Sequence, residues 1–139
     1  MQGESSHHGR VSAQQSLPAG CEPDCRGCRH RTLTLVASVA QKQEYLQRVL
    51  ERWKQVLQVV RAVQEDQRFG YRDRVTLNAR WDAAAGWRFG MMRRDQLVPI
   101  HDCPVHSVRV IRLVALLRTT LPPPAQFPLA YLHVAGGQA

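Results

Sequence analysis

The sequence predicts a small α+β protein with a cysteine loop, a long amphipathic helix, a small antiparallel sheet of three or four strands, and a second helix. Three observations lead to this fold. Three cysteines fall within eight residues near the start. Apolar residues then recur at three- and four-residue steps, and two later stretches alternate apolar with polar residues. The 139 residues, 44% of them hydrophobic, suffice for one domain with its own core.

The first 20 residues are rich in Ser, Gln, Gly and His and have no periodicity. We expect residues 1–20 to be a disordered leader and residues 21–139 to form one domain. The cysteine loop opens that domain. Pro23 and Gly27 within it favour an irregular backbone, which suits several thiolates converging on one point.

A helical pattern begins near Val36, because apolar side chains recur at helical spacing with basic residues between them. We expect an amphipathic helix of about five turns or more that ends by Val60. The apolar positions that define it are Val39, Leu46, Val49, Leu50, Trp53, Val56 and Leu57.

Residues 74–81 alternate, with Val75, Leu77, Ala79 and Trp81 on one face, and therefore predict a strand. Residues 82–86 predict a turn. The alternation of Trp87, Phe89 and Met91 predicts a second strand that pairs back as a hairpin, with Gly90 as a candidate bulge. Residues 97–100 predict a third short strand that leads to Cys103.

Residues 107–119 predict a second helix, which Pro122, Pro123 and Pro124 would terminate. Residues 129–134 predict the start of a further strand. Because no partner strand follows it, we expect the natural sequence to continue beyond Ala139.

The net charge is +8 and the isoelectric point is near 10.2, which favours a polyanionic partner such as nucleic acid. No stretch approaches the roughly 20 apolar residues of a membrane span, and the first 20 residues lack a secretory signal. Four cysteines without an export signal indicate a reducing, cytoplasmic environment in which thiols bind metal. We expect no membrane partner and a monomer.

The cysteines have the spacing C-x3-C-x2-C, formed by Cys21, Cys25 and Cys28, followed by Cys103. Three thiolates from one loop and one distant thiolate complete a four-ligand shell, an arrangement typical of a 4Fe–4S cluster. Zinc is the alternative, although its sites usually bring ligands in two close pairs. Cys103-Pro104 also matches cluster-binding runs, in which proline follows a ligand. His101 and His106 flank Cys103 and are expected to be polar neighbours rather than ligands.

The loop spacing C-x3-C-x2-C also occurs in radical S-adenosylmethionine enzymes. Those enzymes leave one iron open for the cofactor and place the loop in a large barrel of about 200 residues or more. Here a fourth cysteine is present to close the cluster, and a helix rather than a barrel repeat follows the loop. This interpretation is therefore rejected.

Five motifs occur in a specific order along residues 20–135. They are Cys25-Arg26-Gly27-Cys28, the helix around Gln41-Lys42-Gln43, Phe69-Gly70-Tyr71-Arg72-Asp73-Arg74, Arg88-Phe89-Gly90-Met91-Met92-Arg93-Arg94, and Ile100-His101-Asp102-Cys103-Pro104. In this order they resemble the central region of the S-adenosylmethionine-dependent RNA (uracil-5-)-methyltransferases that carry a 4Fe–4S cluster. The chain departs from the family in its shorter first spacing and in Arg26, where glycine is customary.

The resemblance implies that Cys21, Cys25, Cys28 and Cys103 hold the cluster, and that the partner is rRNA or tRNA. Family members continue into a doubly wound methyltransferase domain that binds S-adenosylmethionine and supplies a nucleophilic cysteine. Here all four cysteines are assigned to the cluster. We therefore expect this chain to be the cluster-bearing, RNA-binding portion of a uridine-methylating enzyme, inactive alone. The alternative is a non-catalytic, zinc-stabilised RNA-binding module.

Arginines gather on or beside the predicted strands, and guanidinium groups on one sheet face would bind RNA phosphates. The candidate RNA-binding residues are Arg72, Arg74, Arg93 and Arg94, with Arg80 and Arg88 nearby. The alternative is a solvated polar face. Trp81, Trp87 and Phe89 are candidates for base stacking, although their alternation with polar residues is more typical of core packing.

Overall fold

A computed structural model describes residues 13–136, which divide into two compact units. One unit comprises residues 13–16 and 32–62, and the other comprises residues 17–31 and 63–136. The sequence predicted a single domain from residue 21 onward, whereas the chain passes between the two units three times. Residues 1–12, the larger part of the predicted leader, lie outside the described residues.

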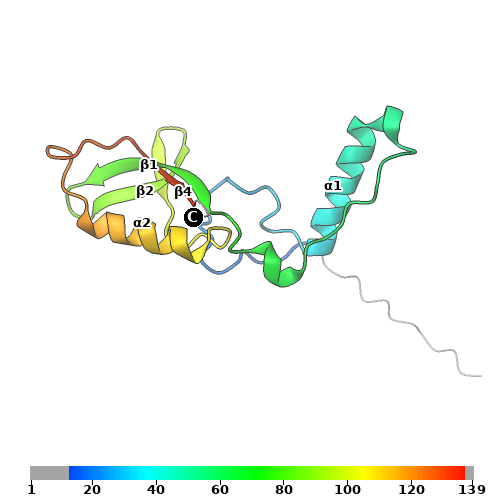
Figure 1. Cartoon of the computed structure of the whole chain (residues 1–139), viewed down its shortest axis with the longest axis horizontal. Coiled ribbons are helices and arrows are strands. Elements are labelled where there is room, and N and C mark those ends of the chain that lie inside the picture. Colours follow the sequence, from blue (N-terminus) through cyan, green and yellow to red (C-terminus); the bar gives the residue numbers. More distant parts are fainter. Residues whose placement is uncertain (1–12, 137–139) are drawn as a thin grey trace, which may run out of the picture. The chain divides into compact units, whose positions relative to one another are not determined.

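The first unit is built on helix α1, which spans Leu35–Val49 (Figure 1). Thr34 caps its start, because the Thr34 hydroxyl accepts a hydrogen bond from the Ala37 amide. The predicted end near Val60 is wrong: the helix closes at Leu50, and a short 3-10 helix, η1, follows at Glu51–Trp53. The Val60 amide then donates to the Gln43 side-chain oxygen at 2.6 Å, which folds the following segment back along α1.

The amphipathic pattern of α1 does not produce a buried face within the described residues. Ser38 is its single buried residue, whereas Val36, Tyr45 and Val49 are each more than half exposed. Residues 13–15, assigned from sequence to the leader, pair with residues 32–34. The Gln15 amide donates to the Thr32 carbonyl and the Thr34 amide to the Ala13 carbonyl. The start of α1 is therefore held by an ordered segment.

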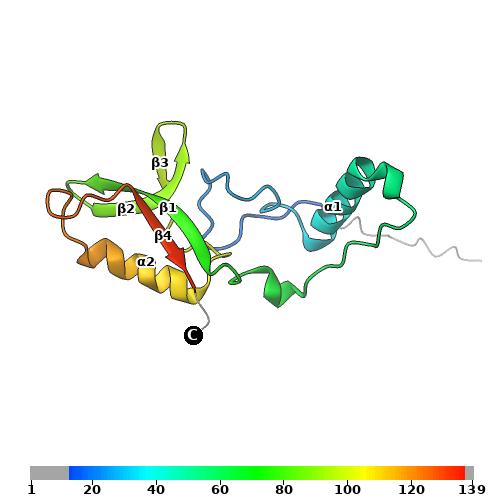
Figure 2. The same cartoon turned by 45° about the horizontal axis from the view of Figure 1, so that its top comes forward.

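The second unit contains a four-stranded antiparallel sheet in the order β3-β2-β1-β4 (Figure 2). Its strands are β1 (Arg74–Asp82), β2 (Gly86–Arg93), β3 (Gln96–Pro99) and β4 (Tyr131–Ala135). A second helix, α2, spans Val108–Thr120, and a short 3-10 helix, η2, spans Glu65–Arg68. The predicted α+β class, the hairpin and both helices are confirmed, with strand ends shifted by one or two residues.

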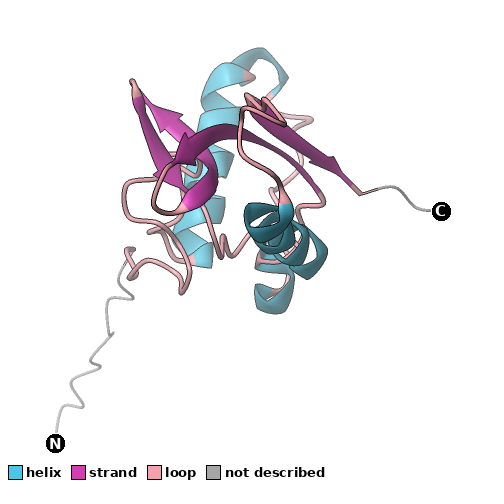
Figure 3. Cartoon of the chain, turned by 90° about the vertical axis from the view of Figure 1, so that its left-hand side faces the viewer, coloured by secondary structure: helices cyan, strands magenta, loops and turns pink. Residues whose placement is uncertain are grey.

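The core lies between the sheet and α2, which covers one face of the strands (Figure 3). Its largest side chains, Trp87 and Phe89, are 1% and 0% exposed. Burial of each such side chain contributes roughly 1.5–3 kcal/mol. Trp87 also donates from Nε1 to the Pro122 carbonyl at 2.7 Å, which ties the proline run after α2 to the sheet. The other buried members are Val75, Leu77, Ala79, Val110, Val114 and Val134.

Gly90 marks the place where β2 changes its partner. Residues up to Gly90 pair with β1, and residues from Gly90 onward pair with β3, both in continuous register. The candidate bulge is therefore absent. The glycine instead permits a close crossing, because a Cβ at this position would lie 1.9 Å from the Val98 carbonyl oxygen.

Candidate functional site

The cysteine loop belongs to the sheet-bearing unit, and so does Cys103. The loop is built from tight turns: the Cys21 amide donates to the Pro18 carbonyl and the Cys25 amide to the Glu22 carbonyl. All four cysteines are free thiols and all are partly exposed. The thiols predicted as ligands therefore come from one compact unit.

Gly20 brings the loop against the segment that carries Cys103. Its φ is +78°, a conformation that favours glycine, and a Cβ there would lie 2.1 Å from the Asp102 carbonyl oxygen. Gly20 precedes Cys21 and Asp102 precedes Cys103. The backbones that carry the first and last cysteines are therefore in direct contact.

The segment after Cys103 is fixed by a second set of backbone contacts. The Gly70 amide donates to the Pro104 carbonyl at 2.8 Å, and the Arg72 amide donates to the Val105 carbonyl at 2.9 Å. The Ser107 amide returns a bond to the Arg72 carbonyl, and the Ser107 hydroxyl caps α2. Cys103 thus occupies a turn held between residues 70–72, which precede β1, and the start of α2.

The pKa of the Cys103 thiol reflects its partial burial. Burial raises this pKa above its ordinary value, while the Val105 and His106 amides act in the opposite direction. The charges of Cys28 and Cys25 raise it further.

Hydrogen-bond donors already approach two of the sulfur atoms. The Gly27 amide donates to Cys25 Sγ at 3.4 Å, and the Arg31 guanidinium lies 3.9 Å from Cys21 Sγ. Arg31 is itself held by the Glu22 and Pro23 carbonyls, at 2.8 and 2.6 Å. Such donors stabilise thiolates and cluster sulfur atoms. The chemistry of this donor set fits a four-thiolate group.

Across residues 13–136, no group of three or more His, Cys, Asp or Glu side chains is arranged to hold a metal ion. The two cysteine segments are in backbone contact at Gly20 and Asp102, and the four thiols fit a cluster in residue type.

His101 and His106 have environments that favour neutral rings. Burial, followed by the charge of Arg118, lowers the pKa of His101, whose Nδ1 accepts a hydrogen bond from Arg118 at 2.8 Å. Burial, followed by the charge of Arg72, lowers the pKa of His106, which is a buried residue. Both shifts favour the neutral form of the ring.

The four candidate RNA-binding arginines divide into two groups. Arg72 and Arg74 are exposed at the start of β1, with Arg72 6.0 Å from the Tyr71 ring centroid. Arg93 and Arg94 are exposed at the β2–β3 turn. Arg80 and Arg88 face each other across β1 and β2, and Arg88 lies 3.8 Å from Asp82.

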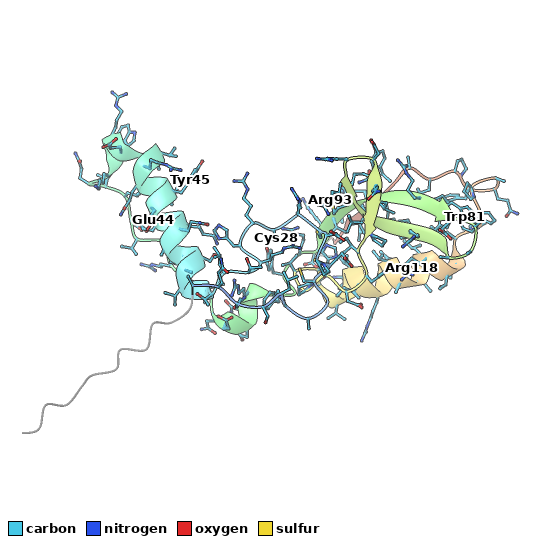
Figure 4. All side chains as sticks on the ribbon, turned by 180° about the vertical axis from the view of Figure 1, so that it is seen from behind. Cys28, Glu44, Tyr45, Trp81, Arg93 and Arg118 are labelled. Atoms are coloured by element: carbon cyan, nitrogen blue, oxygen red, sulfur yellow. The ribbon has the colours of Figure 1, made fainter. Side chains whose placement is uncertain are left out.

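Arg93 connects the sheet to the cysteine loop. Its guanidinium donates to Asp24 at 2.6 Å, and both side chains are largely exposed. Figure 4 shows Arg93 and Cys28 at one end of the unit, with Trp81 at the other. The sequence pattern does not indicate the contacts of Gly20, Asp24 and Asp102. A glycine beside the first cysteine and an aspartate beside the last were the signals available.

The aromatic candidates for base stacking differ in their exposure to solvent. Trp87 and Phe89 are buried in the core, so neither can meet a base. Trp81 is 39% exposed at the end of β1, where it makes an edge-on contact with Trp87. Tyr71 is 58% exposed. Trp81 and Tyr71 remain accessible to a partner.

Comparison with protein-family models, with curated proteins and with solved structures finds no match to this chain. Neither α1 nor α2 has the length and apolar character that a membrane crossing requires, and the same holds for every helix in the described residues.

Proposed function

We propose that this chain is the cluster-bearing, RNA-binding portion of an enzyme that methylates carbon 5 of uridine in rRNA or tRNA. Cys21, Cys25, Cys28 and Cys103 would hold a 4Fe–4S cluster. One observation supports this assignment above the others. The contact of Gly20 with Asp102 brings the cysteine loop to the Cys103 turn, although 74 residues separate Cys28 from Cys103.

The cluster would act as a structural link when bound. It would join the loop to the turn between β3 and α2, beside the contact of Gly20 with Asp102. The chain's own residues provide the surroundings: Arg31 and the Gly27 amide approach the sulfur atoms, and Cys103 is partly buried. S-adenosylmethionine would be the methyl donor in the full-length enzyme of the proposed family. The location we propose is the cytoplasm.

The isolated 139-residue chain should not transfer a methyl group to RNA. Methylation at carbon 5 of uridine in the proposed family uses a cysteine that attacks carbon 6. All four cysteines are assigned to the cluster. Purified chain incubated with labelled S-adenosylmethionine and rRNA or tRNA should leave uridine unlabelled. Labelling by the wild-type chain would contradict this expectation, and its loss in one single Cys→Ser variant alone would identify that cysteine as the nucleophile rather than a cluster ligand.

The charge excess and the exposed arginines of the sheet unit support the proposal of RNA binding. Arg72 and Arg74 have no ion pair among the described residues, so their charges are available to phosphates. The double variant R72Q/R74Q should weaken RNA binding. If both arginines meet phosphates, it should also flatten the logarithmic salt dependence by about 1.4, which is about 0.7 for each contact with a single strand.

Filter-binding titrations at several salt concentrations measure both quantities. Deletion of residues 1–12 is the control, because this segment contains one Arg and no Lys. The deletion should leave affinity and salt slope almost unchanged. If the double variant kept the wild-type slope while the deletion lost it, the sheet arginines would be an ordinary solvated surface.

The second candidate function is a non-catalytic RNA-binding module stabilised by zinc. It is supported by the same four thiols, since four cysteines also form structural zinc sites. Visible absorption separates the two after anaerobic purification. A cluster-bearing chain is brown with broad absorption, whereas a zinc-bearing chain is colourless.

A further inference from the structure

A pocket of about 720 Å³ lies between the cysteine loop and the hairpin formed by β2 and β3. Cys25 and Arg26 line it from the loop, and Arg93 and Arg94 line it from the hairpin. Met91 and Val98 supply apolar surface. The volume is within the range of pockets that bind small ligands or single residues of a polymer.

The pocket is strongly cationic. Three arginines line it against one carboxylate, Asp95. Arg93 also forms an ion pair at 2.6 Å with Asp24, which does not line the pocket. Arg26 and Arg94 have no ion pair or hydrogen bond to another described residue, and both side chains are exposed. Two guanidinium groups are therefore available to an anion that enters between loop and hairpin.

Arg94 has a backbone conformation that is unfavourable for arginine. Its φ is +53°, and it is the sole non-glycine residue with positive φ in the described part of the chain. Arg94 is in the two-residue turn between β2 and β3, a position at which glycine or asparagine is favoured. Strain of this kind is concentrated at functional sites. This backbone conformation makes Arg94 a candidate functional residue.

We propose that this pocket binds one phosphodiester group of single-stranded RNA. Arg26 and Arg94 are the phosphate ligands, and Arg93, held by Asp24, adds its charge beside them. Met91 and Val98 provide the apolar surface against which the adjoining nucleotide lies. This inference rests on the proposed RNA-binding function and extends it, because it names a phosphate site that joins the cysteine loop to the sheet.

The test exploits the strain at Arg94. The variant R94G removes the guanidinium and relieves the backbone, so its melting temperature should equal or exceed that of the wild type. Its affinity for a single-stranded oligouridylate should fall about three- to tenfold, and its salt slope should fall by about 0.7. R26Q should give a similar loss of affinity and slope.

The control variant is R109Q, which removes the same charge from an exposed position of α2. R109Q should keep the wild-type affinity and slope. Fluorescence anisotropy at several salt concentrations, with thermal melts of each variant, provides the readouts.

Wild-type affinity in both R94G and R26Q would overturn the phosphate site while leaving RNA binding elsewhere intact. If R94G lowered both melting temperature and affinity, the affinity of R26Q would decide the question. Weaker RNA binding by R26Q would support the phosphate site, and wild-type binding by R26Q would overturn the site. A wild-type chain that binds no RNA would instead overturn the proposed function itself.

Discussion

Asp82 closes the turn between β1 and β2 with its own side chain. Its Oδ1 accepts hydrogen bonds from the Ala84 and Ala85 amides at 2.9 and 2.8 Å. These bonds, first from Ala85 and then from Ala84, lower the pKa of Asp82 below its ordinary value, and Arg88 acts in the same direction. The stabilisation is therefore present above the ordinary pKa and is lost as the pH falls through the lowered one.

The variant D82A should melt at a lower temperature than the wild type at neutral pH, because two turn amides lose their acceptor. The difference should shrink as the pH falls below the ordinary pKa of 3.8, since the wild type then loses the carboxylate as well. Thermal melts across pH measure this. E44A, which removes a carboxylate from exposed α1 (Figure 4), should show no comparable difference. A pH-independent effect of D82A would contradict the assignment.

Gly20 is the residue on which contact between the two cysteine segments depends. The variant G20A places a methyl group against the Asp102 carbonyl and requires a positive φ of alanine, so the loop must move away from Cys103. We expect lower iron content after anaerobic reconstitution and a lower melting temperature. G86A is the matched control, because Gly86 has a similar φ of +76° and its Cβ would meet the Arg118 carbonyl oxygen at an ordinary 3.8 Å. Equal iron content in G20A and G86A would contradict this role.

The sequence predicted the site only as a set of residue types. The spacing of Cys21, Cys25 and Cys28 indicated one loop, but the approach of Cys103 depends on a backbone contact at Gly20 that no spacing rule specifies. The Asp24–Arg93 ion pair was hidden for the same reason, since its partners are 69 residues apart. Residue type is visible in a sequence, and tertiary neighbours are not.

At the scale of elements, the strands were the most predictable part of the fold. The alternation of Val75, Leu77 and Ala79 matches their burial, and Ser107 with Val108–Thr120 forms the second helix almost as predicted. Strict alternation is a strong signal because one face of the sheet is covered by α2. Trp81 continues the alternation but is exposed, since it lies at the end of β1.

The end of α1 was predicted badly because the apolar pattern continues past the helix. Trp53, Val56 and Val59 keep helical spacing but are more than 60% exposed outside it. Valine has a weaker helix propensity than leucine or alanine. The Val60 amide instead donates a hydrogen bond to the Gln43 side-chain oxygen. This hydrogen bond joins residues 17 positions apart, and the periodicity of apolar residues does not indicate it.

The bond from Val60 to Gln43 gives a prediction for the same element. The variant Q43A should speed hydrogen exchange of the Val60 amide, because this amide loses its acceptor at 2.6 Å. Exchange of the amides within α1 should change little. Q41A removes a similar side chain from an exposed position of α1 and should leave Val60 unaffected. Exchange can be followed by NMR, and equal protection of Val60 in both variants would contradict the bond.

At the scale of the whole molecule, the sequence showed one basic chain, and the structure shows two compact units. Composition cannot reveal this division, because residues 17–31 join the sheet while the segments on both sides join α1. All four cysteines and all four candidate RNA-binding arginines fall within the same unit. The proposed cluster and RNA contacts therefore share a unit, which α1 does not belong to.

A cluster on the four cysteines should also stabilise that unit. It would close a loop of some 75 residues between the cysteine loop and Cys103, so C103S should lower the stability of anaerobically prepared protein by several kcal/mol, a scale set by metal-linked small domains. Thermal melts of wild type and C103S measure the difference. A melting temperature of C103S equal to that of the iron-loaded wild type would contradict a structural role.

The most direct test of the cluster is the metal content of anaerobically reconstituted wild type and of each single Cys→Ser variant. Iron, acid-labile sulfide and zinc are measured per chain together with the visible spectrum. We predict about four iron and about four sulfide per wild-type chain, as a cluster with four thiolate ligands requires. Each of C21S, C25S, C28S and C103S should lower the iron content and the visible absorption. A colourless wild type with one zinc per chain, or full iron content in C103S, would contradict the assignment.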